Sequence, residues 1–344
     1  MKFLSDKALE RLRAGTDEPD LAGTRYRLLE RVARGGMGIV YAAQDEKLER
    51  RVALKVLDVP GTEGELANRL ILEARVLAKL EHPGIVPVHD VGTLADGRVF
   101  YTMKFVEGLR LDKYIETVES VPDRLRLFLR ICDAVAFAHA RGVLHRDLKP
   151  ANIMVGPFGE TLVMDWGLAK IVRGAPSAES TDGDSAATVI EKYAPRSPQN
   201  ENTGSTIATG QGTIMGTPGY MSPEQARGEV HSLDARSDIF SLGALLKFLV
   251  AAKSANGAGE NARIEKSLAA ICAKAAAAEP AQRYGTVQEL AQDVSRYLDG
   301  LAVGAHRETL LEKATRFYRK YRFFILLIAA YLVMRVLLVF FTRR

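Results

Sequence analysis

Three polar side chains at fixed spacing, with an aspartate further along the chain, have the chemistry needed to move a phosphoryl group. Asp147 is followed by Lys149 and Asn152, and Asp165 comes thirteen residues after Asn152. Phosphoryl transfer needs a positioned hydroxyl, a metal ion and charge stabilisation, and little covalent help from the protein. The spacing therefore predicts a proton acceptor (Asp147), a phosphate-directed cation (Lys149) and two metal ligands (Asn152 and Asp165).

A glycine-rich turn lies upstream, between strands predicted over Tyr26–Leu57. Its residues are Gly35-Gly36-Met37-Gly38, and glycine lets a backbone approach phosphate closely. Taken alone, the turn is more typical of a plain hairpin. Lys55 ends the following apolar strand. Glu73 lies on a helix predicted over Leu66–Leu80 by apolar residues every three or four positions, from which it can reach Lys55.

The remaining elements that would position these residues follow from hydrophobic periodicity. Strand character returns at Val86–Phe105, where Asp96-Gly97 is a turn signal. Helical periodicity recurs in four later stretches, which are Leu125–Ala140, Ile239–Val250, Ile264–Ala278 and Val287–Leu298. This order predicts an α+β protein in which a strand-rich part precedes a helical part.

A polar stretch at 173–212 interrupts this pattern. It is rich in Ser, Thr, Gly, Asn and Pro and poor in hydrophobic residues, so it cannot bury enough surface to order itself. Loops this long inside a domain are either functional or disordered. A regulatory loop and an insertion without a role both remain open.

The positive charge of the chain is concentrated in its C-terminal tail. From Val303 to Arg344 there are nine Lys/Arg and two acids, so this tail carries +7, whereas the whole chain carries +5 and the first 302 residues about −2. That distribution gives no reason to expect nucleic-acid binding.

Phe323–Phe341 is apolar except for Arg335, and a helix of this length, roughly 28 Å, predicts a membrane span. Cys132 and Cys272 are expected to pack in the core.

Taken together, the motifs resemble those of the eukaryotic-like protein kinase family. The resemblance covers Tyr26 to Gly300 and is strongest to bacterial membrane-anchored serine/threonine kinases. Its motifs are the glycine-rich turn, Val52-Ala53-Leu54-Lys55, His145-Arg146-Asp147-Leu148-Lys149-Pro150-Ala151-Asn152, Asp165-Trp166-Gly167 and Gly216-Thr217-Pro218-Gly219-Tyr220-Met221-Ser222-Pro223-Glu224. It implies a bilobal kinase fold, with a small antiparallel β-sheet lobe and a larger helical lobe, and the use of ATP and Mg²⁺.

The resemblance also implies a role for each matching residue. Lys55 would contact the α- and β-phosphates and pair with Glu73, and Lys149 would steady the γ-phosphate. Asp147 would accept the substrate proton, and Asn152 and Asp165 would hold Mg²⁺. The nucleotide would further meet Gly35, Gly36, Gly38, Val40, Ala53, Met103 as gatekeeper, Val106 in the hinge, and Met154.

Further expectations from the resemblance concern support and regulation. Glu224 should form a buried pair with Arg283, and Asp238 should brace the catalytic loop, which is His145 to Asn152. Arg146 should bind a phosphate on the activation segment, which runs from Asp165 to Glu224. Thr209 and Thr213 are the best candidates to carry that phosphate. If one copy phosphorylates another, the expected partners include a second copy of this chain in a transient homodimer.

The chain departs from the family pattern in three places. Ala33 stands where the family's glycine-rich motif has its first glycine, two residues before Gly35. Its methyl group is tolerable if φ stays negative. Trp166 replaces a phenylalanine and keeps an aromatic packing role. The region after Gly243 is short, and the helix usual there is missing or reduced to Ser254–Glu260.

The expected organisation has four parts, which are an N-terminal extension (1–24), a kinase domain (25–300), a basic juxtamembrane segment (301–322) and a transmembrane helix (323–342). Basic residues before the span predict a single-pass membrane protein with a cytoplasmic kinase domain.

Protein substrates are the expected partners, with serine or threonine as acceptor because of Lys149 and Thr217. Two alternatives to an active protein kinase stay open. One is a membrane-tethered pseudokinase scaffold, and the other is a kinase of small molecules, against which the Gly216–Glu224 segment argues.

Overall fold

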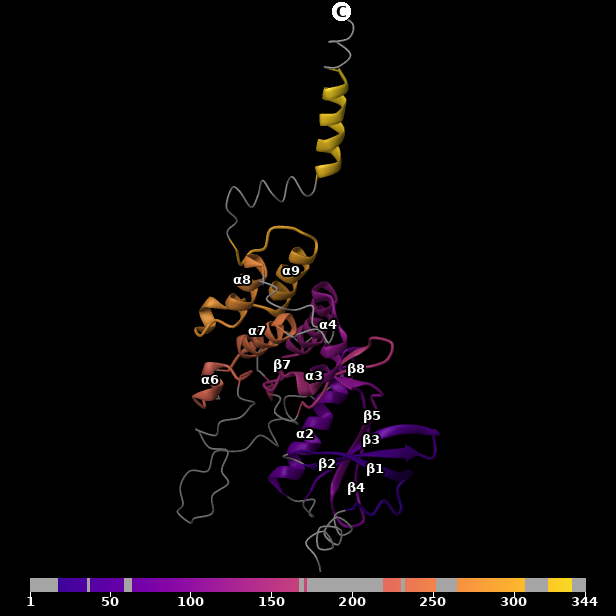
Figure 1. The fold of residues 1–344 in the computed structure, drawn as a ribbon. Coiled ribbons are helices and arrows are strands. Elements are labelled where there is room, and N and C mark those ends of the chain that lie inside the picture. Colours follow the sequence, from indigo (N-terminus) through magenta and orange to yellow (C-terminus); the bar gives the residue numbers. More distant parts are fainter. Residues whose placement is uncertain are drawn as a thin grey trace, which may run out of the picture.

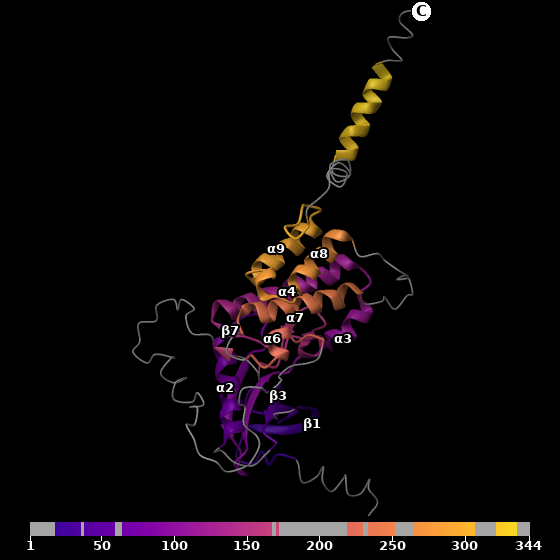
Figure 2. The same ribbon diagram turned by 90° about the vertical axis from the view of Figure 1, so that its left-hand side faces the viewer.

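Two lobes lie one above the other in the computed structural model of this chain (Figures 1 and 2). The lobes confirm the expected bilobal, α+β architecture. The structure describes residues 18–35, 38–58, 64–166, 170–171, 219–229, 233–251, 265–306 and 321–335. Gly36, the polar stretch at 173–212 with Thr209, the neighbouring Thr213 and Thr217, and the short region at 254–260 lie outside the described residues.

The smaller lobe is a five-stranded antiparallel sheet with one long helix packed against it. The strand order is β1-β2-β3-β5-β4, and the helix is α2 (Glu65–Lys79). The strands are β1 (Tyr26–Gly35), β2 (Gly38–Asp45), β3 (Arg50–Val56), β4 (Val88–Thr93) and β5 (Val99–Lys104). Leu70, Ala74 and Leu77 of α2 are buried, which confirms the helix predicted from their spacing.

Strand β3 shows how alternation assigns side chains to the two faces of this sheet. Val52, Leu54 and Val56 are buried in a hydrophobic cluster on one face. Ala53 belongs to the main core on the other face, and Lys55 follows it at the same period of two. Since β3 pairs with β5, Ala53 lies opposite Met103 and Lys55 lies opposite Tyr101.

The larger lobe is mainly helical, with helices α4, α7, α8 and α9 grouped together (Figure 2). Its helical elements are α3 (Leu111–Tyr114), η1 (Ile115–Thr117), α4 (Val121–Ala140), η2 (Pro150–Asn152), α6 (Pro223–Ala226), α7 (Ala235–Ala251), α8 (Lys266–Ala275), η3 (Pro280–Gln282) and α9 (Val287–Leu298). Its short strands are β6 (Leu109–Arg110), β7 (Val143–Leu144), β8 (Ile153–Val155), β9 (Thr161–Val163) and β10 (Lys170–Ile171). They form a β6-β8-β9 sheet and a β7-β10 pair.

Helix α4 is the central helix of this lobe, and its ends follow local sequence signals. Ser120 caps its N-terminus by accepting a hydrogen bond from the backbone N–H of Asp123, and Gly142 with φ 73° lies just beyond its C-terminus. Phe128, Ile131 and other apolar residues along it are fully buried. The prediction of a helix over Leu125–Ala140 is confirmed, although the helix begins earlier because of the Ser120 cap.

Both cysteines lie inside the larger lobe. Cys132 on α4 and Cys272 on α8 are buried free thiols. Burial raises the pKa of Cys132, and it raises the pKa of Cys272 to about 11. The expectation that both act as small core residues is confirmed.

The apolar tail contains a helix that the two lobes do not cover. Residues 321–335 are helical, and this helix stands apart from the lobes in both views (Figures 1 and 2). Its large apolar side chains are exposed, for example Phe323 at 71% and Val333 at 60%. Within the described part of the chain, no helix reaches the length and apolar character needed to cross a membrane. Residues 336–344 lie outside that part.

Candidate active site

A buried ion pair links the sheet of the small lobe to its helix. The ammonium of Lys55 lies 2.8 and 2.9 Å from the two carboxylate oxygens of Glu73 on α2. Tyr101 on β5 donates a hydrogen bond of 2.9 Å to the same carboxylate. Asp165 approaches the ammonium from the larger lobe at 3.5 Å. The predicted pairing of Lys55 with Glu73 is therefore confirmed.

The charges around Lys55 keep its ammonium ionised. Burial alone would lower the pKa of Lys55, but Glu73 and Asp165 outweigh it and hold the pKa above its usual value. Burial and the charge of Glu73 likewise raise the pKa of Tyr101, which therefore stays a hydrogen-bond donor. A fixed positive charge at this position suits a phosphate ligand.

A second buried carboxylate, Asp238 on α7, holds the backbone of the catalytic loop. It accepts hydrogen bonds of 2.8 Å from the backbone N–H groups of His145 and Arg146. Its third partner is His139 on α4, also at 2.8 Å. Burial alone would raise the pKa of Asp238, but the hydrogen bond from His139 and the neighbouring charges lower it. The predicted bracing of the loop by Asp238 is confirmed.

The backbone of this loop is strained at one residue. Arg146 has φ 70°, a left-handed conformation that costs a residue with a side chain about 1–3 kcal/mol. His145 Nε2 lies 3.0 Å from the carbonyl oxygen of Met164, which only accepts, so Nε2 carries the proton. His145 Nδ1 can then accept from the backbone N–H of Asp147 at 3.3 Å. The loop is thus held at several points despite its strain.

The three loop residues predicted to act together lie in mutual contact. The Lys149 ammonium is 2.6 Å from Asp147 Oδ2. The Asn152 amide donates both to Asp147 Oδ2, at 3.0 Å, and to the Asp147 backbone oxygen, at 2.8 Å. One carboxylate oxygen is therefore oriented by a cation and an amide. Such an oxygen can accept a proton from a substrate hydroxyl that lies within hydrogen-bond distance.

Asn152 and Asp165 lie at neighbouring positions across two paired strands. Ile153 on β8 pairs with Val163 on β9, and the Asn152 backbone oxygen accepts from the N–H of Met164. Because the Asn152 amide nitrogen faces Asp147, its side-chain oxygen is left for another partner. The Asp165 side chain is 53% exposed. An amide oxygen and a half-exposed carboxylate fit Mg²⁺, which is usually held by one or two carboxylates together with substrate phosphates.

Among the described residues, no group of three or more His, Cys, Asp or Glu side chains has the geometry to hold a metal ion by itself. The donor set predicted for Mg²⁺ does not need one, because phosphate oxygens and waters complete it.

Trp166, which follows Asp165, is buried in the core. It is 1% exposed, packs against the ring of His145 at 4.6 Å between centroids, and donates from its indole N–H to the carbonyl of Val163 at 3.3 Å. Asp165 itself has φ 57°. The aromatic packing role expected for Trp166 is confirmed, and the indole adds a hydrogen bond that phenylalanine cannot make.

The residues predicted to surround the nucleotide base come from both lobes and from the segment between them. Ala53 and Met103 face each other across β3 and β5 and are nearly buried. Val40 on β2 pairs with Lys55, and Met154 lies on β8. Val106 is half-buried in the segment between β5 and β6. Their contacts with a nucleotide stay a prediction.

The glycine-rich turn is described only at its two ends. Gly35 and Gly38 pair across β1 and β2, while Gly36 is not described. A side chain at Gly38 would collide with the backbone of Val56, so this position requires glycine. Ala33 lies within β1 and is not among the described residues with positive φ, which meets the condition for tolerating its methyl group.

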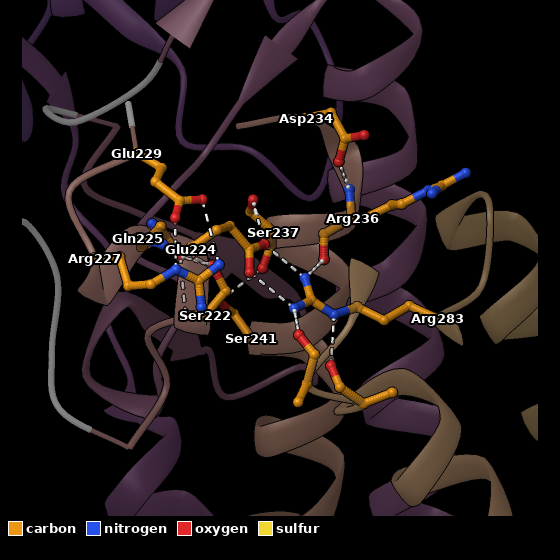
Figure 3. Close-up of polar contacts among 12 residues, drawn as sticks. Ser222, Glu224, Gln225, Arg227, Glu229, Asp234, Arg236, Ser237, Ser241 and Arg283 are labelled. Carbon is orange, nitrogen blue, oxygen red and sulfur yellow. Dashed lines mark hydrogen bonds and ion pairs between the residues drawn. The ribbon is translucent and has the colours of Figure 1, made fainter. Parts of the chain in front are cut away.

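The short helix α6 is fixed to the rest of the larger lobe by a second buried ion pair (Figure 3). The Glu224 carboxylate accepts two hydrogen bonds from Arg283, of 2.6 and 2.8 Å, and one of 2.9 Å from Ser237. Burial alone would raise the pKa of Glu224, but the hydrogen bonds from Arg283 and Ser237 hold it at about 2. The predicted pairing is confirmed.

Sequence reasoning missed four supporting side chains. Tyr101 contacts Glu73, and His139 contacts Asp238. Ser237 contacts Glu224, and Gln225 contacts the catalytic loop at Arg146. Tyr101 had a usable signal, because it lies two residues before Met103 and therefore shares its face of the strand. The other three contacts had none, because they join residues of different elements, 99, 79 and 13 positions apart.

Comparisons with known proteins agree with this geometry. Residues 26–303 match the family described as "Protein kinase domain". The chain is 36% identical over 331 residues to serine/threonine-protein kinase PknD of Chlamydia trachomatis, which covers 86% of this chain and 34% of that protein. It is 33% identical over 315 residues to PknD of Protochlamydia amoebophila, with coverage of 80% and 30%. The chain thus spans about a third of the length of these curated relatives.

The crystal structure of the Mycobacterium tuberculosis PknI kinase domain has a similar fold. The TM-score is 0.54 at 24% identity, over 79% of this chain and 96% of that domain. At this identity the likeness bears on the fold alone.

Replacing Glu224 with glutamine should change both the stability of the protein and its pH dependence. At pH 7 we expect the free energy of unfolding to fall by about 3–5 kcal/mol, because the buried Arg283 loses its counter-charge. The folded pKa of about 2 lies below the unfolded value, so the wild-type contribution is present above pH 4.5 and is lost as the pH falls towards 2. The difference between wild type and Glu224→Gln should narrow by about 2 kcal/mol between pH 6 and pH 3. Urea denaturation at several pH values measures it.

The matched control for this experiment is Glu229→Gln, since Glu229 is an exposed acid just after α6 that pairs with Arg227. It should change the free energy of unfolding by less than about 0.5 kcal/mol. A constant difference between wild type and Glu224→Gln from pH 6 to pH 3 would contradict the depressed pKa.

Replacing Trp166 with phenylalanine should lower the free energy of unfolding by about 2 kcal/mol. The variant loses the hydrogen bond to Val163 and leaves part of the indole volume unfilled. Urea unfolding followed by far-UV circular dichroism measures the loss. The control is Phe158→Leu, because Phe158 is 95% exposed and its replacement should have little effect. Equal stability of Trp166→Phe and wild type would show that the indole contributes no more than a phenyl ring.

Proposed function

This chain belongs to the protein kinase family, and we propose that it is an active serine/threonine kinase that transfers the γ-phosphate of ATP to protein substrates. The observation that carries the proposal is the assembled catalytic loop, in which Lys149 and Asn152 both contact Asp147. The Lys55–Glu73 pair, formed with Asp165 beside it, supports the same conclusion. All the parts that phosphoryl transfer requires are present.

In this proposal each group has one task. The Asp147 carboxylate accepts the proton of the acceptor hydroxyl, and the Lys149 ammonium faces the phosphoryl group in transfer. Lys55 contacts the α- and β-phosphates, and Val40, Ala53, Met103, Val106 and Met154 surround the base. Asn152 and Asp165 hold Mg²⁺, which neutralises phosphate charge when bound.

Arg146 links this chemistry to a proposed regulation by phosphorylation. Arg146 is half-buried, and burial lowers the pKa of its guanidinium although Asp238 partly opposes this effect. A guanidinium that is partly shielded from water is well suited to bind a phosphate with two hydrogen bonds. We expect phosphorylated Thr209 or Thr213 to supply that phosphate, in a reaction of one copy on another.

The main alternative is a pseudokinase scaffold, which would bind partners without catalysis. A pseudokinase typically lacks one of the groups needed for transfer. Here Lys55, Glu73, Asp147, Asn152 and Asp165 are all present, and the contacts among them favour catalysis.

A second proposal concerns the tail, for which we propose a membrane span over residues 323–342. Two observations support it. The helix at 321–335 exposes apolar side chains all around, including Leu326 and Leu332, and the apolar sequence continues to Phe341. Uncovered apolar surface of this extent is unfavourable in water. Arg319, Lys320 and Arg322 precede it, which favours a cytoplasmic kinase domain.

Arg335 is the one charge within the proposed span. A charge in the hydrocarbon region is costly unless it reaches the interface or a partner. Arg335 is seven residues from Thr342, so its long side chain can extend towards the head groups.

Autophosphorylation tests the catalytic proposal. The full chain in phospholipid vesicles, given labelled ATP and Mg²⁺, should incorporate phosphate, and Asp147→Asn should reduce the rate by at least about 100-fold because the proton acceptor is lost. The matched control is Asp133→Asn, an exposed aspartate on α4, which should keep wild-type activity. Mass spectrometry of the product should find phosphate on Thr209 or Thr213. ATP binding without any incorporation would favour the scaffold.

Alkaline carbonate extraction tests the tail proposal. Membranes containing the full chain should retain it at high pH, since a spanning helix is held by burial of apolar surface rather than by charge. A chain ending at Arg322 should be released. Release of the full chain as well would show peripheral attachment.

A further inference from the structure

Gln225 of α6 touches the catalytic loop beside the proton acceptor. Its side-chain amide donates a hydrogen bond of 2.8 Å to the backbone carbonyl of Arg146, the residue immediately before Asp147. We propose that Gln225 is a positioning residue for catalysis, whose amide fixes the peptide between Arg146 and Asp147 and thereby the direction of the Asp147 carboxylate.

The orientation of the Gln225 amide follows from its partners. The amide oxygen lies 3.1 Å from the backbone N–H of Ser222 and 3.0 Å from the Ser222 hydroxyl, both of which can donate. The amide nitrogen faces the Arg146 carbonyl, which can only accept. Reversing the amide would set two oxygens against each other at 2.8 Å and remove the acceptor from Ser222. The nitrogen must therefore face the catalytic loop.

The peptide that Gln225 holds directly follows the strained residue of the loop. Arg146 has φ 70°, and its N–H is held from the other side by Asp238. The carbonyl of Arg146 and the N–H of Asp147 belong to the same peptide plane. That N–H has a longer hydrogen bond, 3.3 Å to His145, so the bond from Gln225 is the shorter of the two that fix the plane. A rotation of this plane would turn Asp147 directly.

Gln225 can fix the loop because it is itself held rigidly. It is 5% exposed and completes a capping box with Ser222 at the start of α6. Its neighbour Glu224 is bound to Arg283 and Ser237 (Figure 3). The position of α6 is therefore transmitted through one amide to the catalytic loop.

A plainer role for Gln225 would be capping of α6 alone. Capping uses the side-chain oxygen, which accepts from Ser222, whereas positioning uses the nitrogen, which donates to Arg146. Glutamate has the same shape and keeps the accepting oxygen but lacks the donor when ionised. The substitution Gln225→Glu therefore separates the two roles.

We expect Gln225→Glu to lower kcat at least tenfold at pH 8, with the KM for ATP within twofold of wild type. The assay uses the full chain in vesicles with myelin basic protein as acceptor. An ionised carboxylate would repel the Arg146 carbonyl, whereas a protonated one donates to it. Burial against an oxygen raises the pKa of the introduced carboxyl group. The ratio of variant to wild-type kcat should therefore rise at least threefold from pH 8 to pH 6.

The ratio is the relevant quantity because the surrounding charges are the same in both proteins. They are Arg146 and Asp147 on the catalytic loop, Asp238 on α7, and the Glu224–Arg283 pair. Their own titration therefore appears in the wild-type profile as well. The matched control is Gln288→Glu, an exposed glutamine on α9, which should keep wild-type kcat at every pH.

Two results would overturn the inference. One is a wild-type kcat for Gln225→Glu at pH 8, and the other is a loss that does not change with pH. If Gln225→Glu does not fold by circular dichroism, Gln225→Met, which has similar volume and no donor, takes its place. It should lose kcat at least tenfold at all pH values, and wild-type kcat would refute the positioning role.

This inference rests on the proposed kinase activity. An inactive wild type would refute that activity, whereas active wild type and active variant would refute the positioning role alone.

Discussion

The rest of the site is built around the buried ion pair between Lys55 and Glu73, which joins the sheet of the small lobe to helix α2. Removing both charges from water is costly, and the cost is offset only when the geometry is good and further hydrogen bonds are made. Here two close contacts join the pair, and Tyr101 adds a third to Glu73. Asp165 joins from the other lobe. Lys55 on the sheet thus contacts both Glu73 on helix α2 and Asp165 at the start of the activation segment.

The catalytic loop is constrained in a different way. Here a strained backbone, rather than a buried ion pair, must be held in place by its neighbours. A left-handed Arg146 persists only when its surroundings over-determine its conformation. Asp238 and Gln225 hold its two backbone polar groups, and they come from α7 and α6, which are separate elements. The Glu224–Arg283 pair and the catalytic loop therefore belong to one polar system, joined through α6, in which each buried charge has hydrogen-bonding partners. Such a system is rigid when complete and costly when one member is missing.

Sequence reasoning could predict those contacts that depend on fixed spacing within a motif. The Lys55–Glu73 pair, the Glu224–Arg283 pair and the bracing role of Asp238 all came from motifs whose order matched a known family. The family resemblance also predicted the antiparallel sheet of the small lobe, and helical periodicity predicted helix α2. It could not find His139 or the amide of Gln225, because those contacts join residues 99 and 79 positions apart. Only the packing of the helices brings them together.

The burial of both cysteines has a practical consequence for chemistry on this protein. Cys132 and Cys272 are the two cysteines of the chain, and both are closed off from solvent with raised thiol pKa values. Oxidants and alkylating reagents act on the exposed thiolate, so the folded protein should be nearly inert to both. A cysteine introduced on its surface would be the single reactive thiol, available for a spectroscopic label without removing any native cysteine.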